Sequence, residues 1–258
     1  MKLIFLGSGS AFSPLKENFQ SNMLLEAPSG KRLLIDCGTD ARLSLAKFNL
    51  THKHINAVYI SHFHADHAGG LEWLGFSTKF ESPPQKPKLF THPRMIKRLW
   101  SRVLSGGLQS LKGKKPATFS SFFKIAKLKN KKYFTWASIR FELVKTIHVY
   151  NGKHLLPSFG LFFEIYKTKI FITTDTQFTP QYLMPYYQEA DIIFQDCETL
   201  KKASKVHPQF KSLTTLPEKI KSKMWLYHYN PGHLPHAKAH GFRGFVKRGQ
   251  IFYFKKLK

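Results

Sequence analysis

Cysteine, acidic residues and long apolar runs are all scarce in this chain of 258 residues, and each scarcity excludes a class of protein. Two cysteines, Cys37 and Cys197, do not suggest the disulfide framework of a small secreted domain, which favours a reduced, cytoplasmic setting. The apolar start at residues 3–6 is too short for a signal sequence or a membrane span. Because no Pro/Gly/Ser-rich linker divides the sequence, we expect residues 1–258 to form one globular domain.

The chain is strongly basic, with 41 Lys and Arg against 15 Asp and Glu and a formal net charge of +26. A positive field of this size favours polyanionic partners such as nucleic acid. The lysines gather in four stretches, at residues 112–115, 124–132, 201–202 and 255–258. A solvated, lysine-rich surface explains the same composition, because net charge bears on non-specific affinity rather than on chemistry.

The most informative stretch is His62-Phe63-His64-Ala65-Asp66-His67. Residues 55–60 before it form a short apolar run that predicts a buried strand, and Gly69-Gly70 after it allow a sharp turn. Imidazole nitrogens and carboxylate oxygens are ligands of divalent metals such as zinc, and four of them this close can serve two neighbouring ions. The stretch therefore indicates a two-metal hydrolase; a merely polar loop is the alternative.

This H-x-H-x-D-H string is similar to the signature of the metallo-β-lactamase fold superfamily, and further stretches resemble its ribonuclease Z branch. Residues 1–10 resemble that branch's opening strand and glycine turn, Gln20-Ser21-Asn22 follows, and residues 33–38 resemble its apolar strand ending in Asp-x-Gly. The matches recur in family order to about residue 230. The resemblance implies an α/β fold, a four-layer αββα sandwich with the metals at one edge between the two sheets.

The resemblance also implies further metal ligands at the ends of later strands. Residues 141–147 predict a strand that ends directly on His148, whereas His154 begins an H-x-x-P-x-x-G pattern and is a second candidate for the same ligand. We prefer His148, because residues 149–154 resemble a small insertion with an Asn-Gly turn. Asp175 follows an apolar strand, with Thr174 where the family carries glycine, and His228 lies near the end of the apolar run 224–229.

The resulting ligand set serves two divalent ions, with zinc as first choice and manganese or iron as alternatives. We expect one ion to be held by three histidines, the other by two histidines and an aspartate, and both to share a bridging carboxylate. The residues are His62, His64 and His148 for the first ion, Asp66, His67 and His228 for the second, and Asp175 as the bridge.

Three residues carry the catalytic roles that the resemblance implies. His207 stands where the ribonuclease Z branch has a histidine that protonates the leaving group, so it is the expected general acid. Asp196 would steady its charged form, although Gln195-Asp196 replaces the branch's His-Glu. Asp66 would orient the nucleophile or take its proton, and the two ions would lower the pKa of a bridging water to supply hydroxide.

Four functions compete at this point. RNA phosphodiester hydrolysis leads, because of the resemblance and the basic charge. A cyclic-nucleotide or other small-molecule phosphodiesterase comes second, since the chain is shorter than the usual ribonuclease Z and has no clear Gly/Pro-rich arm for transfer RNA. A lactonase or thioesterase is a third possibility, but its substrate would not require the strongly positive net charge of the chain. A non-catalytic nucleic-acid-binding module is the fourth, and the intact set of metal ligands argues against it. Family members are often dimers, so the resemblance permits a homodimer; no membrane partner is expected.

Overall fold

The computed structural model describes residues 1–113, 115–126, 128 and 132–255. Several lysines of the basic stretches lie outside the described residues, namely Lys114, Lys127, Lys129, Lys131, Lys256 and Lys258. Within the described part of the chain, no helix is long and apolar enough to span a membrane.

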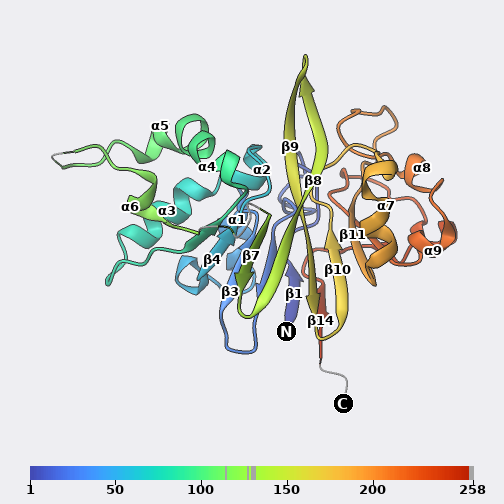
Figure 1. The fold of residues 1–258 in the computed structure, drawn as a ribbon, viewed down its shortest axis with the longest axis horizontal. Coiled ribbons are helices and arrows are strands. Elements are labelled where there is room, and N and C mark those ends of the chain that lie inside the picture. The colour runs from blue at the N-terminus through green and yellow to red at the C-terminus, as the bar shows by residue number, and fades with distance from the viewer. Residues whose placement is uncertain (114, 127, 129–131, 256–258) are drawn as a thin grey trace.

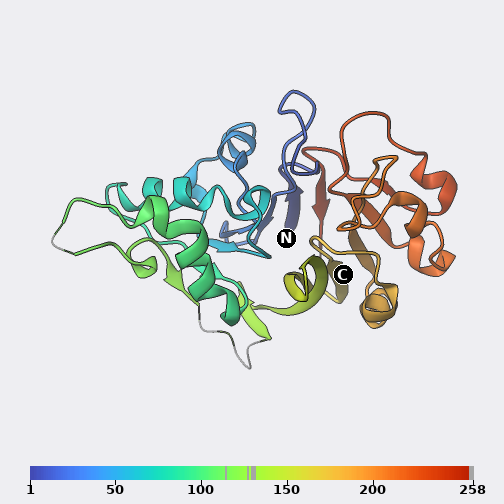
Figure 2. The same ribbon diagram turned by 90° about the horizontal axis from the view of Figure 1, so that it is seen from above.

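Two mixed seven-stranded sheets pack against each other in the middle of the molecule (Figures 1 and 2). The first sheet has the order β14-β1-β2-β3-β4-β5-β6 and the second the order β13-β12-β11-β10-β9-β8-β7. The strands of the first sheet are β1 (Lys2–Phe5), β2 (Met23–Glu26), β3 (Arg32–Ile35), β4 (Ala57–Tyr59), β5 (Lys88–Phe90), β6 (Lys124–Ile125) and β14 (Ile251–Tyr253). Those of the second are β7 (Tyr133–Trp136), β8 (Ile139–Asn151), β9 (His154–Ile165), β10 (Thr168–Ile172), β11 (Ile192–Asp196), β12 (Met224–Tyr227) and β13 (Gly244–Phe245).

Helices cover the outer face of each sheet, which confirms the expected αββα sandwich. Beside the first sheet lie α1 (Ala41–Ala46), α2 (Ala65–Ala68), α3 (Leu71–Lys79), α4 (Pro93–Leu99), α5 (Ser105–Leu108) and α6 (Phe119–Phe122). Beside the second lie α7 (Pro180–Glu189), α8 (Phe210–Leu213) and α9 (Glu218–Lys221). Short helical turns complete the chain at η1 (His52–His54), η2 (Trp100–Leu104) and η3 (Ala237–His240).

The apolar runs of the sequence form strands because both of their faces are buried. In β3, Leu33 and Ile35 point into the core between the sheets, whereas Leu34 packs on the helical side against Ala41 and Leu45 of α1. A strand covered on both faces needs continuous rather than alternating apolar residues. The same pattern holds in β1, where Leu3 and Phe5 face the other sheet and Ile4 faces the helices. The inward-facing residues of both strands pack the two sheets against each other.

The long β8–β9 hairpin corrects one expectation about the chain around His148. The strand does not end at His148, because β8 continues to Asn151 and β9 begins at His154, so the expected insertion is the tip of one hairpin. The pairing register shifts between Ile147 and Val149, which places a bulge at His148. Bulges near active sites re-aim a side chain, and this one accompanies a fully buried His148 in the middle of a strand.

The candidate site lies where several strands end at one edge of the sandwich. The H-x-H-x-D-H stretch follows β4, and Asp175 and His228 follow β10 and β12. Strands β10, β11 and β12 are parallel, so their carboxyl ends meet at the same edge. Residues far apart in the sequence are thereby brought together between the two sheets.

Candidate metal centre

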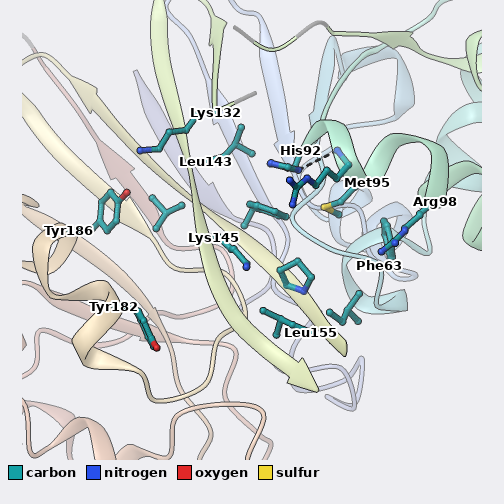
Figure 3. Close-up of a pocket in the computed structure, with 15 residues that line it drawn as sticks. Phe63, His92, Met95, Arg98, Lys132, Leu143, Lys145, Leu155, Tyr182 and Tyr186 are labelled. Atoms are coloured by element: carbon teal, nitrogen blue, oxygen red, sulfur yellow. Dashed lines mark hydrogen bonds between the residues drawn. The ribbon is translucent and has the colours of Figure 1, made fainter. Parts of the chain in front are cut away.

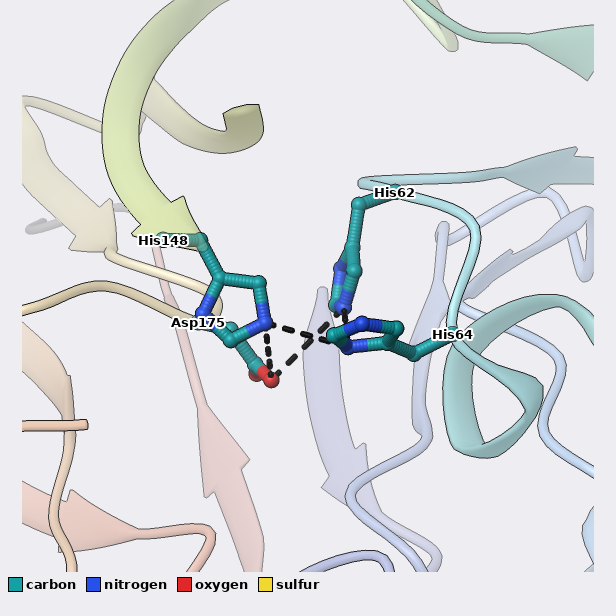
Figure 4. Close-up of side chains that lie close together, drawn as sticks. All are labelled: His62, His64, His148 and Asp175. Atoms are coloured by element: carbon teal, nitrogen blue, oxygen red, sulfur yellow. Dashed lines mark hydrogen bonds and ion pairs between the residues drawn. The ribbon is translucent and has the colours of Figure 1, made fainter. Parts of the chain in front are cut away.

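Seven side chains converge in two groups that share one carboxylate. His62, His64, His148 and Asp175 form the first group, shown in Figure 4. The second consists of Asp66, His67, His228 and the same Asp175, and within each group the ligand atoms lie within 4.8 Å of one another. The structure thus brings together every metal ligand predicted from the sequence. The alternative candidate, His154, is exposed at the start of β9 and belongs to neither group.

Hydrogen bonds on the outer side of the histidines determine which ring nitrogen faces inward. His148 Nδ1 donates to the carbonyl oxygen of Val206 at 3.1 Å, and His67 Nδ1 donates to Asp36 Oδ2 at 2.8 Å. His62 Nδ1 lies 3.0 Å from Ser61 Oγ, whose own hydrogen goes to Asp36. In the neutral form of each ring the hydrogen is therefore on Nδ1, which leaves Nε2, directed at the shared centre, free to bind a metal, as is usual for metal-ligating histidines.

Asp36 is a supporting residue that the ligand prediction missed. It is buried, and besides His67 it accepts hydrogen bonds from the backbone nitrogen and hydroxyl of Ser61, both at 2.8 Å. The available signal was the resemblance of residues 33–38 to a strand ending in Asp-x-Gly. This carboxylate therefore fixes the positions of Ser61, just before the motif, and His67, at its end, relative to each other.

The charges at the site fit two divalent cations. Asp36, Asp66, Asp175 and Asp196 are all buried, yet among the described residues their ion-pair partners are histidines only, with no lysine or arginine, in a chain of net charge +26. Several buried polar atoms also lack a hydrogen-bond partner, including His67 Nε2 and Asp175 Oδ1. Buried charges and orphaned polar atoms are costly, and metal ions would satisfy both.

The inner nitrogens point at a common centre rather than at one another. His64 Nδ1 lies 3.0 Å from His62 Nε2 and 3.1 Å from His148 Nε2. One imidazole nitrogen has a single hydrogen or a single lone pair, so it cannot satisfy both neighbours. Three converging imidazoles beside a carboxylate are instead a zinc-type donor set.

The pKa values of the histidines divide the centre into two halves. Burial lowers the pKa of His62 and His64, and it lowers that of His148 to about 4, so these rings are neutral and able to act as ligands. Burial also opposes the charged forms of His67 and His228, but the Asp175 carboxylate and its acidic neighbours raise both pKa values well above the usual value. Binding of a cation in this second group would therefore release protons.

His207 and Asp196 lie at the border of the centre, and together with the predicted ligand His228 they form a third group of possible metal ligands. His207 Nδ1 donates to Asp196 Oδ2 at 2.8 Å, and His207 Nε2 lies 3.9 Å from Asp175 Oδ2. Burial would lower the pKa of His207, but the Asp196 carboxylate raises it above its ordinary value. The structure thus places the predicted acid and its partner together beside the ligand groups, with the imidazolium form favoured.

A cavity of about 560 Å³ opens onto this centre. Its lining includes His64, Asp66, Asp175 and His207, and its volume falls in the range of small-molecule sites, roughly 300–1,000 Å³. A second cavity, of about 880 Å³, lies beside Phe63 and is lined by Arg94, Arg98 and Lys145 together with aromatic rings (Figure 3). Phe63 separates two predicted ligands in the sequence, so the second cavity adjoins the metal centre.

The fold and the site together define a hydrolase of the metallo-β-lactamase fold with a centre suited to two divalent ions. A model of the anti-Pycsar protein Apyc1 family matches residues 1–252. The chain belongs to this family, and it is a metal-dependent phosphodiesterase.

Comparison with individual proteins agrees with this assignment. The chain is 34% identical over 231 residues to an anti-Pycsar protein Apyc1 of Paenibacillus harenae, covering 89% of this chain and 90% of the relative. It is 33% identical over 255 residues to that of Paenibacillus sp. (strain J14), covering 98% of both.

Solved structures share the fold that was expected from the sequence. The metallo-β-lactamase fold protein YhfI from Bacillus subtilis superposes with a TM-score of 0.74 at 17% identity, covering 97% of this chain and 98% of that one. Human tRNase Z, short form, superposes with a TM-score of 0.66 at 18% identity, covering 98% and 99%. At such identities the likeness concerns the fold.

Proposed function

We propose that this phosphodiesterase hydrolyses a cyclic nucleotide, using two divalent ions held by the seven residues of the centre. The observation that carries the proposal is that Asp175 belongs to both ligand groups and also lines a cavity of about 560 Å³. A cavity of this size suits a mononucleotide. The Apyc1 relatives are cyclic nucleotide-degrading phosphodiesterases, which supports the same substrate class.

The residues present favour zinc as the metal, because imidazole nitrogens make up five of the ligands predicted from the sequence and carboxylates supply the rest. Manganese and iron remain alternatives. When bound, two such ions lower the pKa of a coordinated water and neutralise phosphate charge. The chain's own residues then orient the reactants and move the protons.

Asp66 is the proposed acceptor of the proton from the attacking water. Its carboxylate is partnered by His67 and His228, with Oδ2 3.2 Å from His228 Nε2, and these histidines hold its pKa well below the usual range against the effect of burial. A carboxylate that is ionised before the reaction can orient the water and take its proton as the bond to phosphorus forms.

His207 is the proposed donor of the proton to the leaving oxygen. The Asp196 carboxylate keeps its imidazole charged, and the ring lines the cavity together with Asp175. Water adds to phosphorus, one of the two ester P–O bonds breaks, and the departing alkoxide takes the proton to become a hydroxyl group. The product is a nucleoside monophosphate.

RNA remains the second candidate substrate. The cations of the adjoining cavity, Arg94, Arg98 and Lys145, have no ion-pair partner among the described residues and lie beside aromatic rings (Figure 3). Such a surface suits a phosphate backbone. A cytoplasmic location and a homodimer, both expected from the sequence, likewise stay proposals.

A substrate competition tests the proposal. Metal-loaded protein is given 3′,5′-cyclic nucleotides, single-stranded RNA and a precursor transfer RNA with a 3′ trailer, with an EDTA-treated sample as control. We expect the highest kcat/KM on a cyclic nucleotide and loss of all turnover with EDTA. Turnover of RNA alone would contradict the proposal and would show that RNA is the substrate.

A further inference from the structure

Two large apolar side chains that line the cavity at the metal centre are exposed to solvent. Phe12 is 88% exposed and Leu200 is 50% exposed, and both line this cavity together with Asp66, Asp175 and His207. Exposure of a phenylalanine ring to water is unfavourable, and most phenylalanine side chains are therefore buried. Apolar side chains at the mouth of a polar site are typical of ligand binding.

The two side chains come from loops of different sheets. Phe12 lies in the loop between β1 and β2 of the first sheet, in a turn closed by a hydrogen bond from Ser13 N to Ser10 O at 3.1 Å. Leu200 follows β11 of the second sheet. Because the cavity lies at the edge between the sheets, its apolar walls come from both halves of the sandwich.

Hydrogen bonds connect these loops to each other through Asn230. Asn230 Oδ1 accepts from the backbone nitrogen of Thr199 at 3.0 Å, and Asn230 Nδ2 donates to Ser10 Oγ at 3.4 Å. Asn230 also follows closely after the predicted ligand His228 in the sequence. The rim of the cavity is therefore held at a fixed position relative to the metal centre.

The second loop is anchored in the same way. Both carboxylate oxygens of the buried Glu198 accept from the backbone nitrogen of Ser204, at 3.1 and 3.0 Å, which closes the loop that carries Leu200. Further along this loop, the carbonyl oxygen of Val206 accepts from the predicted ligand His148. A preorganised apolar rim binds a flat ligand with little loss of conformational entropy.

We propose that Phe12 and Leu200 bind the nucleobase of the cyclic nucleotide, with the base stacked on the Phe12 ring and covered by Leu200. The inference rests on the proposed function and specifies which part of the substrate each end of the cavity takes. The charged inner end receives the phosphate, and the apolar rim receives the base. Stacking uses the π-face that every base presents, so Phe12 contributes to binding of purine and pyrimidine cyclic nucleotides alike.

Steady-state kinetics of Phe12→Ala test the inference. We expect KM for a cyclic nucleotide to rise at least about tenfold with kcat little changed, because stacking is made in both ground state and transition state. Phe12→Tyr should restore the wild-type KM. On the same cyclic ribose phosphate without a base, Phe12→Ala and wild type should behave alike.

Phe80→Ala provides a matched control, since Phe80 is also exposed (69%) but does not line the cavity. Its kinetics should equal those of wild type. A KM for Phe12→Ala within twofold of wild type, or an equal change on the base-free substrate, would overturn the inference while leaving the proposed function intact. Absence of wild-type turnover on every cyclic nucleotide would instead reject the proposed function, and the inference with it.

Discussion

Asp36 and His67 are joined by a hydrogen bond of 2.8 Å, and this bond connects the end of β3 to the metal-ligand stretch that follows β4. It leaves His67 Nε2 directed at Asp66 and Asp175, at 3.1 and 3.2 Å. Asp36 has a left-handed backbone, with φ of 61°, a conformation that residues other than glycine seldom adopt. Such local strain is kept where surrounding structure requires it, as at a functional site.

Replacement of this carboxylate should weaken metal binding. We expect Asp36→Asn to lower the affinity for the ion held by the His67 group about 10- to 100-fold, because an amide cannot orient both Ser61 and His67 as the carboxylate does. Competition with a chromogenic chelator measures this affinity. Asp191→Asn, at an exposed carboxylate, is the control. Equal affinities in the two variants would show that Asp36 does not support the ligand.

The choice between the two histidines of the β8–β9 hairpin can be tested by metal content. His148→Ala should lose metal from the first group, because His148 Nε2 lies 3.5 Å from Asp175 Oδ2 inside the cluster. His154→Ala should retain it, because His154 is exposed outside the cluster. Elemental analysis after dialysis measures both, and a greater loss in His154→Ala would reverse the assignment.

Close backbone packing at Gly38 predicts a strong effect of a single methyl group. A Cβ at this position would lie 2.2 Å from the carbonyl oxygen of Asp66, so Gly38→Ala must displace the segment that carries the predicted ligands. We expect loss of metal and at least about tenfold lower kcat/KM. Gly106→Ala, where a Cβ meets nothing within 4 Å, should leave both unchanged. Wild-type activity in Gly38→Ala would mean that this segment tolerates displacement.

The pH profile of kcat should reveal the role of His207. A general acid acts in its protonated form, so activity is lost as pH rises through the pKa of the acid. Asp196 raises the pKa of His207, and Asp196→Asn should therefore move the alkaline limb to lower pH. His207→Ala should abolish the limb and reduce kcat about 10²- to 10⁴-fold with metal content unchanged. An alkaline limb at the same pH in both variants would assign it to another group.

The fold and the position of the site could be predicted because each depends on short, local patterns. Apolar runs such as residues 33–35 gave strands, and the sandwich is confirmed. Six of the seven predicted ligands follow the ends of β4, β10 and β12, whereas His148 lies within β8, and the topology brings all of them to one edge. Their assignment to the two ions stays a prediction.

Other features depend on contacts between distant residues and could not be predicted. The bulge at His148 and the role of Asp36 arise from pairing between β8 and β9 and from packing of β3 against the motif. Thr174 has φ of 51°, which explains why glycine suits this position in the family, but the sequence alone shows only a threonine. The cavity rim joins residues 10–12 to residues 199–206 through Asn230, a contact that no local pattern indicates.

The most direct test of the account is the rate of cyclic nucleotide hydrolysis as metal-free protein is titrated with zinc. Because Asp175 belongs to both ligand groups, we expect the rate to rise until two equivalents are bound per chain, and Asp175→Ala to bind less metal and remain inactive. Full activity at one equivalent, or normal turnover in Asp175→Ala, would contradict a centre in which two ions share this carboxylate.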